Sequence, residues 1–155
     1  MADYASLKKV SLFSILGDKH LKSIFKVCSE RKFAPDETIV EQGNPGVGLF
    51  IVLEGSVQIT KQLKDGSIVQ IALGGPGDVI GEMSVLDGAT RTASVTALKP
   101  TTCLVLAAWS FKSLIEERPE VAVGILPVIV KRFRDTNDAL IELRGSKAQV
   151  APVDL

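Results

Sequence analysis

The most constraining feature of this sequence is a series of short β-branched runs, separated by glycine turns, that fills its middle part from Arg31 to about Leu106. Within the series, apolar residues either alternate with polar ones or form short continuous stretches, and both patterns predict strands. Many short strands separated by glycine turns are typical of an antiparallel barrel or sandwich. The predicted strands are 38–40, 49–53, 57–60, 68–71, 93–97 and 101–106.

The sequence also predicts the turns between these strands. Asp65-Gly66 lies between two alternating runs, and this dipeptide is typical of a tight hairpin. Glycine and proline cluster at 43–46 and again at 74–77, where we expect the chain to reverse.

The segments on both sides of the strands follow the helical period. Residues 5–30 predict two helices separated by Gly17, with Asp18 as the N-cap of the second. After the strands, 110–117 and a longer segment from Pro119 to about Arg144 are helical, and Gly145 ends the last helix. The prediction is an α+β fold: a small antiparallel β-barrel of the jelly-roll (β-roll) kind, flanked by N-terminal helices and a C-terminal helix pair. A chain of 155 residues fits one domain. We assign that domain to 1–145 and a flexible tail to 146–155.

Composition argues against several functions. Lys plus Arg and Asp plus Glu both number 18, so the basic excess expected of a nucleic-acid partner is missing. His20 is the only histidine, which leaves no metal site and no catalytic residues, so we predict no enzyme. Cys28 and Cys103 are expected to be reduced, buried thiols. No signal peptide is predicted, and the most apolar stretch, 121–130, is too short to span a membrane, so we expect a cytoplasmic protein.

The chemistry is concentrated in the segment from Gly81 to Val95. Gly77 and Gly81 let a ligand approach the backbone closely, and a short helix beginning near Glu82 would present free N–H groups to an anion. Arg91 can return to the same place, where its fork donates two hydrogen bonds to a phosphate, and Thr92 can add a hydroxyl. Glu82 would repel phosphate but suits a sugar hydroxyl. The alternative is an ordinary surface turn in which Arg91 and Glu82 form an ion pair.

This segment resembles the phosphate-binding cassette of cyclic-nucleotide-binding domains. It reads Gly-Glu-Met-Ser, six variable residues, and then Arg-Thr-Ala-Ser-Val. The resemblance implies that Glu82 binds the ribose 2′-hydroxyl and that Arg91 binds the cyclic phosphate. It also implies a site lined by the backbone amides of Gly81, Met83 and Ser84, by Thr92 next to the arginine, and by Ala93. Val69, Ile71 and Val79 are candidate walls for the base or, equally, plain core.

Two residues depart from the family pattern. Thr90 stands where a proline often precedes the arginine, so we expect a less rigid turn. Trp109 stands where a polar helix cap is usual, and we expect it to be packed rather than to mark a contact surface.

The last helix carries an apolar stripe with the spacing of a heptad seam, formed by Leu126, Ile129, Phe133, Thr136, Leu140 and Leu143. The stripe either packs on the chain's own barrel or forms a parallel homodimer, as in bacterial catabolite-activator-type regulators. In the second arrangement Thr136 and Asn137 fall where such regulators contact the base. Pro127 is either a hinge or a silent kink. Lys131, Arg132 and Arg134 are assigned to the solvated face.

The resulting hypothesis is a binding module for a cyclic nucleotide, cAMP rather than cGMP, with no other cofactor. Ligand binding would reorient the last helix and regulate a separate effector protein. Too few residues follow 144 for a helix-turn-helix, a kinase or a channel pore, so the chain acts on that effector or is part of a longer protein. The competing hypothesis is a module of the same fold that serves interaction or dimerisation and no longer binds nucleotide.

Overall fold

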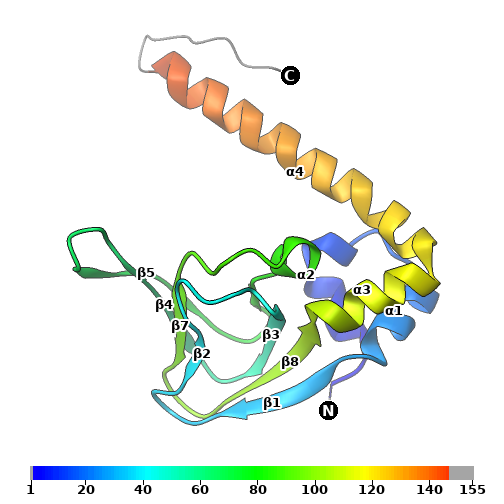
Figure 1. Ribbon diagram of the computed structural model, residues 1–155, viewed down its shortest axis with the longest axis horizontal. Coiled ribbons are helices and arrows are strands. Elements are labelled where there is room, and N and C mark those ends of the chain that lie inside the picture. The colour runs from blue at the N-terminus through cyan, green and yellow to red at the C-terminus, as the bar shows by residue number, and fades with distance from the viewer. Residues whose placement is uncertain (1, 147–155) are drawn as a thin grey trace.

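The computed structural model of the protein describes residues 2–146. Figure 1 shows the β-strands gathered on one side, the N-terminal helices and α3 beside them, and a long last helix that rises away from both. The elements, in chain order, are the 3-10 helices η1 (Tyr4–Lys9) and η2 (Ser11–Phe13), α1 (Asp18–Phe25), β1 (Ser29–Phe33), β2 (Thr38–Val40), β3 (Gly48–Glu54), β4 (Val57–Gln62), β5 (Ile68–Gly74), β6 (Val79–Ile80), α2 (Ser84–Asp87), β7 (Ser94–Ala97), β8 (Thr101–Ala107), α3 (Ala108–Glu117) and α4 (Pro119–Ser146).

The strands form two four-stranded antiparallel sheets, in the orders β1-β8-β3-β6 and β2-β7-β4-β5. Phe33, Val52 and Cys103 of the first sheet pack in one cluster with Val57 and Val95 of the second, so the two sheets face each other across an apolar core. The predicted α+β fold is confirmed, and its strand region consists of two facing sheets. The boundary between domain and tail stays a prediction, and 147–155 lie outside the described residues.

The hairpin between β4 and β5 has the turn that Asp65-Gly66 predicts. Gly66 has a φ of 88°, and its N–H donates to the carbonyl of Leu63 at 3.0 Å. The Asp65 carboxylate accepts from the N–H of Ser67 at 2.9 Å, which closes the turn from the other side.

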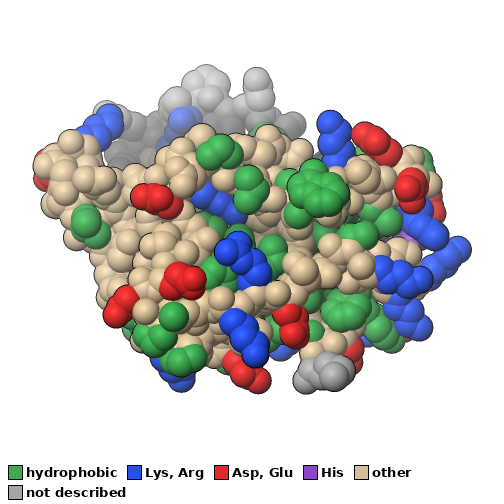
Figure 2. All heavy atoms as spheres, turned by 60° about the horizontal axis from the view of Figure 1, so that its bottom comes forward, with side chains coloured by type: hydrophobic (Ala, Val, Ile, Leu, Met, Phe, Trp, Pro, Cys, Tyr) green, Lys and Arg blue, Asp and Glu red, His purple; other side chains and the backbone are tan. Residues whose placement is uncertain are grey.

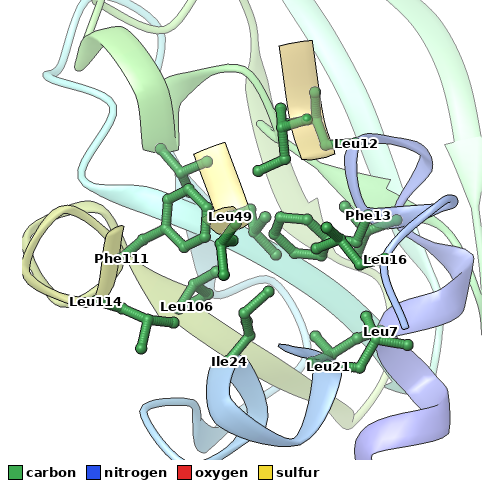
Figure 3. Packing of buried hydrophobic residues seen from close by; sticks show 14 of the residues in the cluster. Leu7, Leu12, Phe13, Leu16, Leu21, Ile24, Leu49, Leu106, Phe111 and Leu114 are labelled. Carbon is green, nitrogen blue, oxygen red and sulfur yellow. The ribbon is translucent and has the colours of Figure 1, made fainter. Parts of the chain in front are cut away.

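A second core joins the helices to the sheet that contains β3 and β8. Phe13 of η2 and Phe111 of α3 lie with ring centroids 5.6 Å apart, above Leu49 and Leu106. Figure 3 shows these side chains and that of Ile24 in α1 converging on one another. This core therefore fixes α3, and with it the start of α4, relative to the sheet.

The N-terminal segment differs from the prediction. Only 18–25 form an α-helix, Gly17 rather than Asp18 is its N-cap, and two 3-10 helices precede it. Ser29–Phe33, whose first residues were predicted as helix, is strand β1 and pairs with β8. Four of its five residues are exposed, so no alternation in the sequence marks it as a strand. Pairing with β8 determines its conformation instead.

Helix α4 begins at Pro119, as predicted, and contacts the rest of the described chain mainly through its first half. Val121 and Ile125 are buried in the helical core, whereas most of the stripe beyond Pro127 is exposed. The second half of α4 stands clear of both sheets in Figure 1. The alternative in which the stripe packs on the chain's own strands is therefore wrong for Leu126, Phe133, Leu140 and Leu143.

Charged side chains of both signs are spread over the surface, as the equal numbers of acidic and basic residues predict. On the face shown in Figure 2, both Lys or Arg and Asp or Glu side chains occur from one side to the other, with apolar patches between them. Among residues 2–146, no helix combines the length and apolar character needed to cross a membrane.

Both cysteines are free, and burial raises the pKa of Cys28 to about 12 and that of Cys103 to about 11. Both thiols are therefore protonated at neutral pH.

Candidate functional site

The cassette, residues 81–92, runs from the end of β6 through α2 to the start of β7. It begins at Gly81, whose φ of 70° is in the left-handed region that only glycine adopts readily. Helix α2 ends at Gly88, which has a φ of 63° and caps the helix in the same conformation. The carboxylate of Asp87 accepts from the N–H of Ala89 at 2.9 Å and turns the chain back toward β7.

The returning half of the cassette is held by the glycine turn at 43–46. The N–H of Arg91 donates to the carbonyl of Asn44 at 2.8 Å, and the carbonyl of Arg91 accepts from Gly43 at 2.9 Å. Gly46 donates to the carbonyl of Ala89 at 2.9 Å, and Thr90 forms a β-bridge with Pro45. These contacts constrain the turn at Thr90 without the proline that is common there.

Ser84 ties the first half of the cassette to β3. Its buried hydroxyl lies 2.8 Å from the carbonyl of Gly48 and 2.6 Å from that of Gly81, and donates to one of them at a time. The N–H of Ser84 also donates to the carbonyl of Gly81, at 3.1 Å. The prediction that this amide is available to a ligand is therefore wrong. In the described part of the chain, the N–H groups of Glu82 and Met83 have no backbone acceptor.

Arg91 presents a half-buried cation at this point. Its guanidinium covers Gly81 so closely that a Cβ there would overlap Nη1, and Nη2 donates to the carbonyl of Gly48. Burial lowers the pKa of Arg91, although arginine stays charged in proteins. No carboxylate in residues 2–146 lies within 4.0 Å of it. A charged fork without a countercharge favours an anionic ligand.

A cavity of about 220 Å³ opens beside this guanidinium. Apolar side chains from both sheets form most of its wall, and Thr92 is exposed at its edge. The lining residues are Val40, Ile59, Val79, Ile80, Gly81, Arg91, Thr92, Ala93 and Val95. The arrangement places an anion-binding group at the edge of an apolar pocket, which suits a ligand that carries one phosphate and one flat ring system.

Of the three residues predicted to form the wall against the base, one lines the cavity and two do not. Val79 lines the cavity, whereas Val69 and Ile71 lie on the edge strand β5, where they are 42% and 55% exposed. Neither of these two lines the cavity. Instead Val40, Ile59 and Val95 complete its wall, and the sequence analysis missed them. Their positions in the strands predict that these side chains point inward. The sequence does not show that a cavity, rather than packed core, lies beside them.

Glu82 is paired with a residue that was assigned to the solvated face. Arg132 of α4 donates through Nη2 to Oε1 of Glu82, and Nη1 of the same guanidinium lies 3.2 Å from the sulfur of Met83. The hydroxyl of Ser11 lies 3.4 Å from both carboxylate oxygens. The alternative of an Arg91–Glu82 ion pair is therefore wrong, and so is the solvent assignment of Arg132.

Three further predicted residues lie away from the cavity. Thr136 is exposed and Asn137 half-buried on the free half of α4, and the single chain does not bring them to Arg91. Trp109, at the start of α3, is 74% exposed, so the expectation that it is packed is wrong.

Comparison with known proteins identifies the family of this chain. The family model described as "Cyclic nucleotide-binding domain" matches residues 30–118, which include both sheets and the whole cassette. Among curated proteins, the CRP-like cAMP-activated global transcriptional regulator of Mycobacterium tuberculosis (strain CDC 1551 / Oshkosh) is 28% identical over 137 residues, 88% of this chain and 61% of that protein. The cyclic AMP receptor protein of Thermus thermophilus is 30% identical over 131 residues, 84% of this chain and 61% of that protein.

Solved structures point the same way. The N-terminal domain of a transcriptional regulator from Streptomyces coelicolor A3(2) superposes with a TM-score of 0.80 at 35% identity, over 87% of this chain and 94% of that domain. The catabolite activator protein of Thermus thermophilus gives a TM-score of 0.68 at 30% identity, over 86% of this chain and 62% of that one. The chain spans about three fifths of the length of the curated relatives it matches. By its family match, its cassette and its fold, this chain belongs to the cyclic nucleotide-binding domain family.

Proposed function

We propose that this chain is a cyclic-nucleotide sensor that prefers cAMP to cGMP and needs no other cofactor. The observation that carries the proposal is the half-buried Arg91 guanidinium, which lies at the edge of an apolar cavity and has no carboxylate partner among residues 2–146. Arg91 binds the cyclic phosphate, supported by the N–H groups of Glu82 and Met83 and by the Thr92 hydroxyl. Glu82 accepts from the ribose 2′-hydroxyl, and the role is binding rather than catalysis.

The preference for cAMP rests on the cavity wall and on the relatives. Val40, Ile59, Val79 and Val95 are apolar, and they suit a base with few exocyclic polar groups. The two bacterial relatives are named for cAMP activation and cAMP reception. Thr92 is the polar side chain at the edge that could also contact a guanine, so it is the position at which the preference is decided.

Thermal unfolding tests this ligand assignment. A ligand that binds only the folded chain raises its melting temperature in proportion to the logarithm of concentration over Kd. We expect millimolar cAMP to raise the melting temperature by several degrees, about 4–8 °C per kcal/mol for a domain near 100 residues and less for larger ones. cGMP should raise it less, and 5′-AMP, which has a second phosphate charge and no cyclic phosphate ring, least of all. Equal shifts for all three would contradict a site that is specific for cyclic nucleotides.

The proposed output is a change in α4. The fully buried residues of the helix, Val121 and Ile125, lie before Pro127. After it, Ile129 packs partly on the core and Arg132 pairs with Glu82. Proline lacks the N–H that would continue the helical hydrogen bonds, so Pro127 is the natural hinge. Ligand binding shifts the population of α4 positions by its differential affinity for them. The module is proposed to act in the cytoplasm on an effector, which is supported by the two similar proteins that are named as transcriptional regulators, from Mycobacterium tuberculosis and Streptomyces coelicolor A3(2).

The exposed stripe on α4 supports a parallel homodimer. Leu126 and Phe133 are 57% and 64% exposed, and both repeat at seam positions together with Leu140 and Leu143. Among the described residues of a single chain, this apolar surface stays exposed. In such a pair, Thr136 and Asn137 would reach the base from either copy.

A charge in the seam tests the homodimer. Phe133→Asp is expected to convert the dimer to a monomer, because an unpaired carboxylate in an apolar seam is costly. Sedimentation equilibrium measures the mass, and Arg144→Ala, in the last turn of α4, serves as the control that stays dimeric. A wild-type chain that sediments as a monomer at high micromolar concentration would rule out this part of the proposal.

A module of the same fold that only mediates interaction is the competing function. It would leave the α4 stripe in use and the cavity unused. The half-buried charge on Arg91 speaks against it, because a cation with no carboxylate partner among residues 2–146 costs free energy that a bound anion would offset.

A further inference from the structure

Two side chains of the cassette share one buried acceptor, the carbonyl of Gly48 in β3. Arg91 donates to this carbonyl through Nη2, and the hydroxyl of Ser84 lies 2.8 Å from it. The carbonyl of the preceding residue, Val47, accepts from the N–H of Ala108 at 2.8 Å. Because consecutive carbonyls of a strand point to opposite sides, the Gly48 carbonyl points away from β8 and toward the cassette.

No strand continues beside Gly48 to bond this carbonyl. Strand β6 ends at Ile80, which lies opposite Phe50, and Gly81 then turns the chain away with its φ of 70°. Gly48 is buried, and buried backbone carbonyls nearly always have a donor. Within residues 2–146, the donors that reach this carbonyl are the two cassette side chains. It therefore depends partly on the guanidinium that is proposed to bind the phosphate.

The Ser84 hydroxyl can bond this carbonyl without moving its oxygen. Ser84 is 7% exposed, and its Oγ lies 2.6 Å from the carbonyl of Gly81 as well as 2.8 Å from that of Gly48. A hydroxyl has one proton to donate, so a change of partner needs only rotation of the O–H bond. The Gly81 carbonyl keeps the N–H of Ser84, at 3.1 Å, when the hydroxyl turns away.

We infer that Ser84 is a positioning residue, which acts as the reserve donor of the Gly48 carbonyl. Without ligand, Arg91 holds this carbonyl and the Ser84 hydroxyl donates to Gly81. When the cyclic phosphate draws Nη2 of Arg91 away, the hydroxyl turns to Gly48 and keeps the carbonyl paired. The exchange lowers the free-energy cost of releasing Arg91, so it raises the affinity for the ligand. The ligand step rests on the proposed function, whereas the shared acceptor does not.

The shared acceptor is tested without ligand, by comparing the stability of the wild-type chain, Ser84→Ala, Arg91→Ala and the double variant. Each single variant keeps one donor at Gly48 and should lose little stability. The double variant leaves a buried carbonyl without a donor, so the increase in its unfolding equilibrium constant should exceed the product of the two single increases by about fivefold or more. Urea unfolding measures all the constants.

Thr101 provides the matched control, because its hydroxyl is also buried between two carbonyls. Its Oγ1 lies 2.8 Å from the carbonyl of Lys99 and 3.2 Å from that of Ser56. Strand β8 runs from Thr101 to Ala107, which lies opposite Gly48, so the two sites are roughly 20 Å apart. Thr101→Val should lose stability additively with the arginine variant and should keep the wild-type affinity for cAMP.

Calorimetry with cAMP tests the exchange itself. Ser84→Ala should bind cAMP about fivefold to 100-fold more weakly than the wild-type chain, because the release of Arg91 then leaves the Gly48 carbonyl unpaired. This measurement needs only single variants, each with a donor left at Gly48, so it decides the question even if the double variant does not fold.

The outcomes separate the inference from the function on which its ligand step rests. Additive stability losses of Ser84→Ala and Arg91→Ala would show that the serine is no reserve donor. An affinity of Ser84→Ala for cAMP within about twofold of the wild-type value would show that Arg91 is not exchanged, and the sensor would stand. If the wild-type chain binds no cAMP, the sensor and the exchange both fall.

Discussion

Replacing Arg91 with alanine is expected to weaken cAMP binding by more than about 100-fold, the range found when one partner of a buried, hydrogen-bonded charge pair is removed. Among the described residues that line the cavity, only the Arg91 side chain carries a charge. Without it, the phosphate would lose a bidentate contact and enter a cavity with mostly apolar walls. Isothermal titration calorimetry measures the change directly.

Two controls accompany this variant. Arg91→Lys keeps the charge but loses the planar fork, and it should bind with intermediate affinity. Arg144→Ala, near the end of α4, should bind like the wild-type chain. Circular dichroism must show that Arg91→Ala is folded, which we expect because Arg91 makes one side-chain hydrogen bond in the described residues, to the Gly48 carbonyl. A folded Arg91→Ala chain with wild-type affinity would show that the phosphate binds elsewhere.

Gly81→Ala is expected to abolish binding as effectively as the loss of Arg91 itself. A methyl group at this position would overlap Nη1 of Arg91, so the guanidinium would have to leave its place. The φ of 70° also strains any residue with a Cβ, which costs about 1–3 kcal/mol of stability. Calorimetry should show an affinity loss of more than about 100-fold, and chemical unfolding should show the stability loss.

Gly66→Ala is the matched control for the backbone effect. Gly66 also has a positive φ, 88°, but a Cβ there would meet nothing within 4 Å, and the hairpin turn does not line the cavity. The variant should lose stability to a similar degree and keep its affinity for cAMP. Equal affinity losses in both variants would mean that general strain, rather than displacement of Arg91, explains the result.

The sequence predicted those parts of the fold whose signals are local. The β4–β5 hairpin follows from Asp65-Gly66, and the start of α4 follows from Pro119. Strand β1 could not be predicted, because its exposed residues show no alternation and its pairing with β8 joins distant parts of the chain. The two-residue strand β6 is likewise defined by its neighbour β3.

For the site, too, residues with local signals were predicted, and residues brought together by packing were missed. Gly81, Glu82 and Arg91 belong to one continuous segment, and the structure keeps them within one cassette. Arg132 was missed because only the packing of α4 brings it to Glu82. Three neighbouring cations, Lys131, Arg132 and Arg134, give no sign in the sequence of which one turns inward. Val69 and Ile71 were predicted as walls for the base or, equally, as plain core, and they are neither. Alternation identifies two faces of a strand, but an edge strand such as β5 can expose both of them.

The most direct test of the central claim is a calorimetric titration of the wild-type chain with cAMP, after co-purified nucleotide has been removed by unfolding and refolding. The account predicts saturable binding of one cAMP per chain, competed by excess cGMP only at higher concentration. Absence of binding heat at two temperatures, with a refolded chain whose melting temperature cAMP does not change, would contradict it.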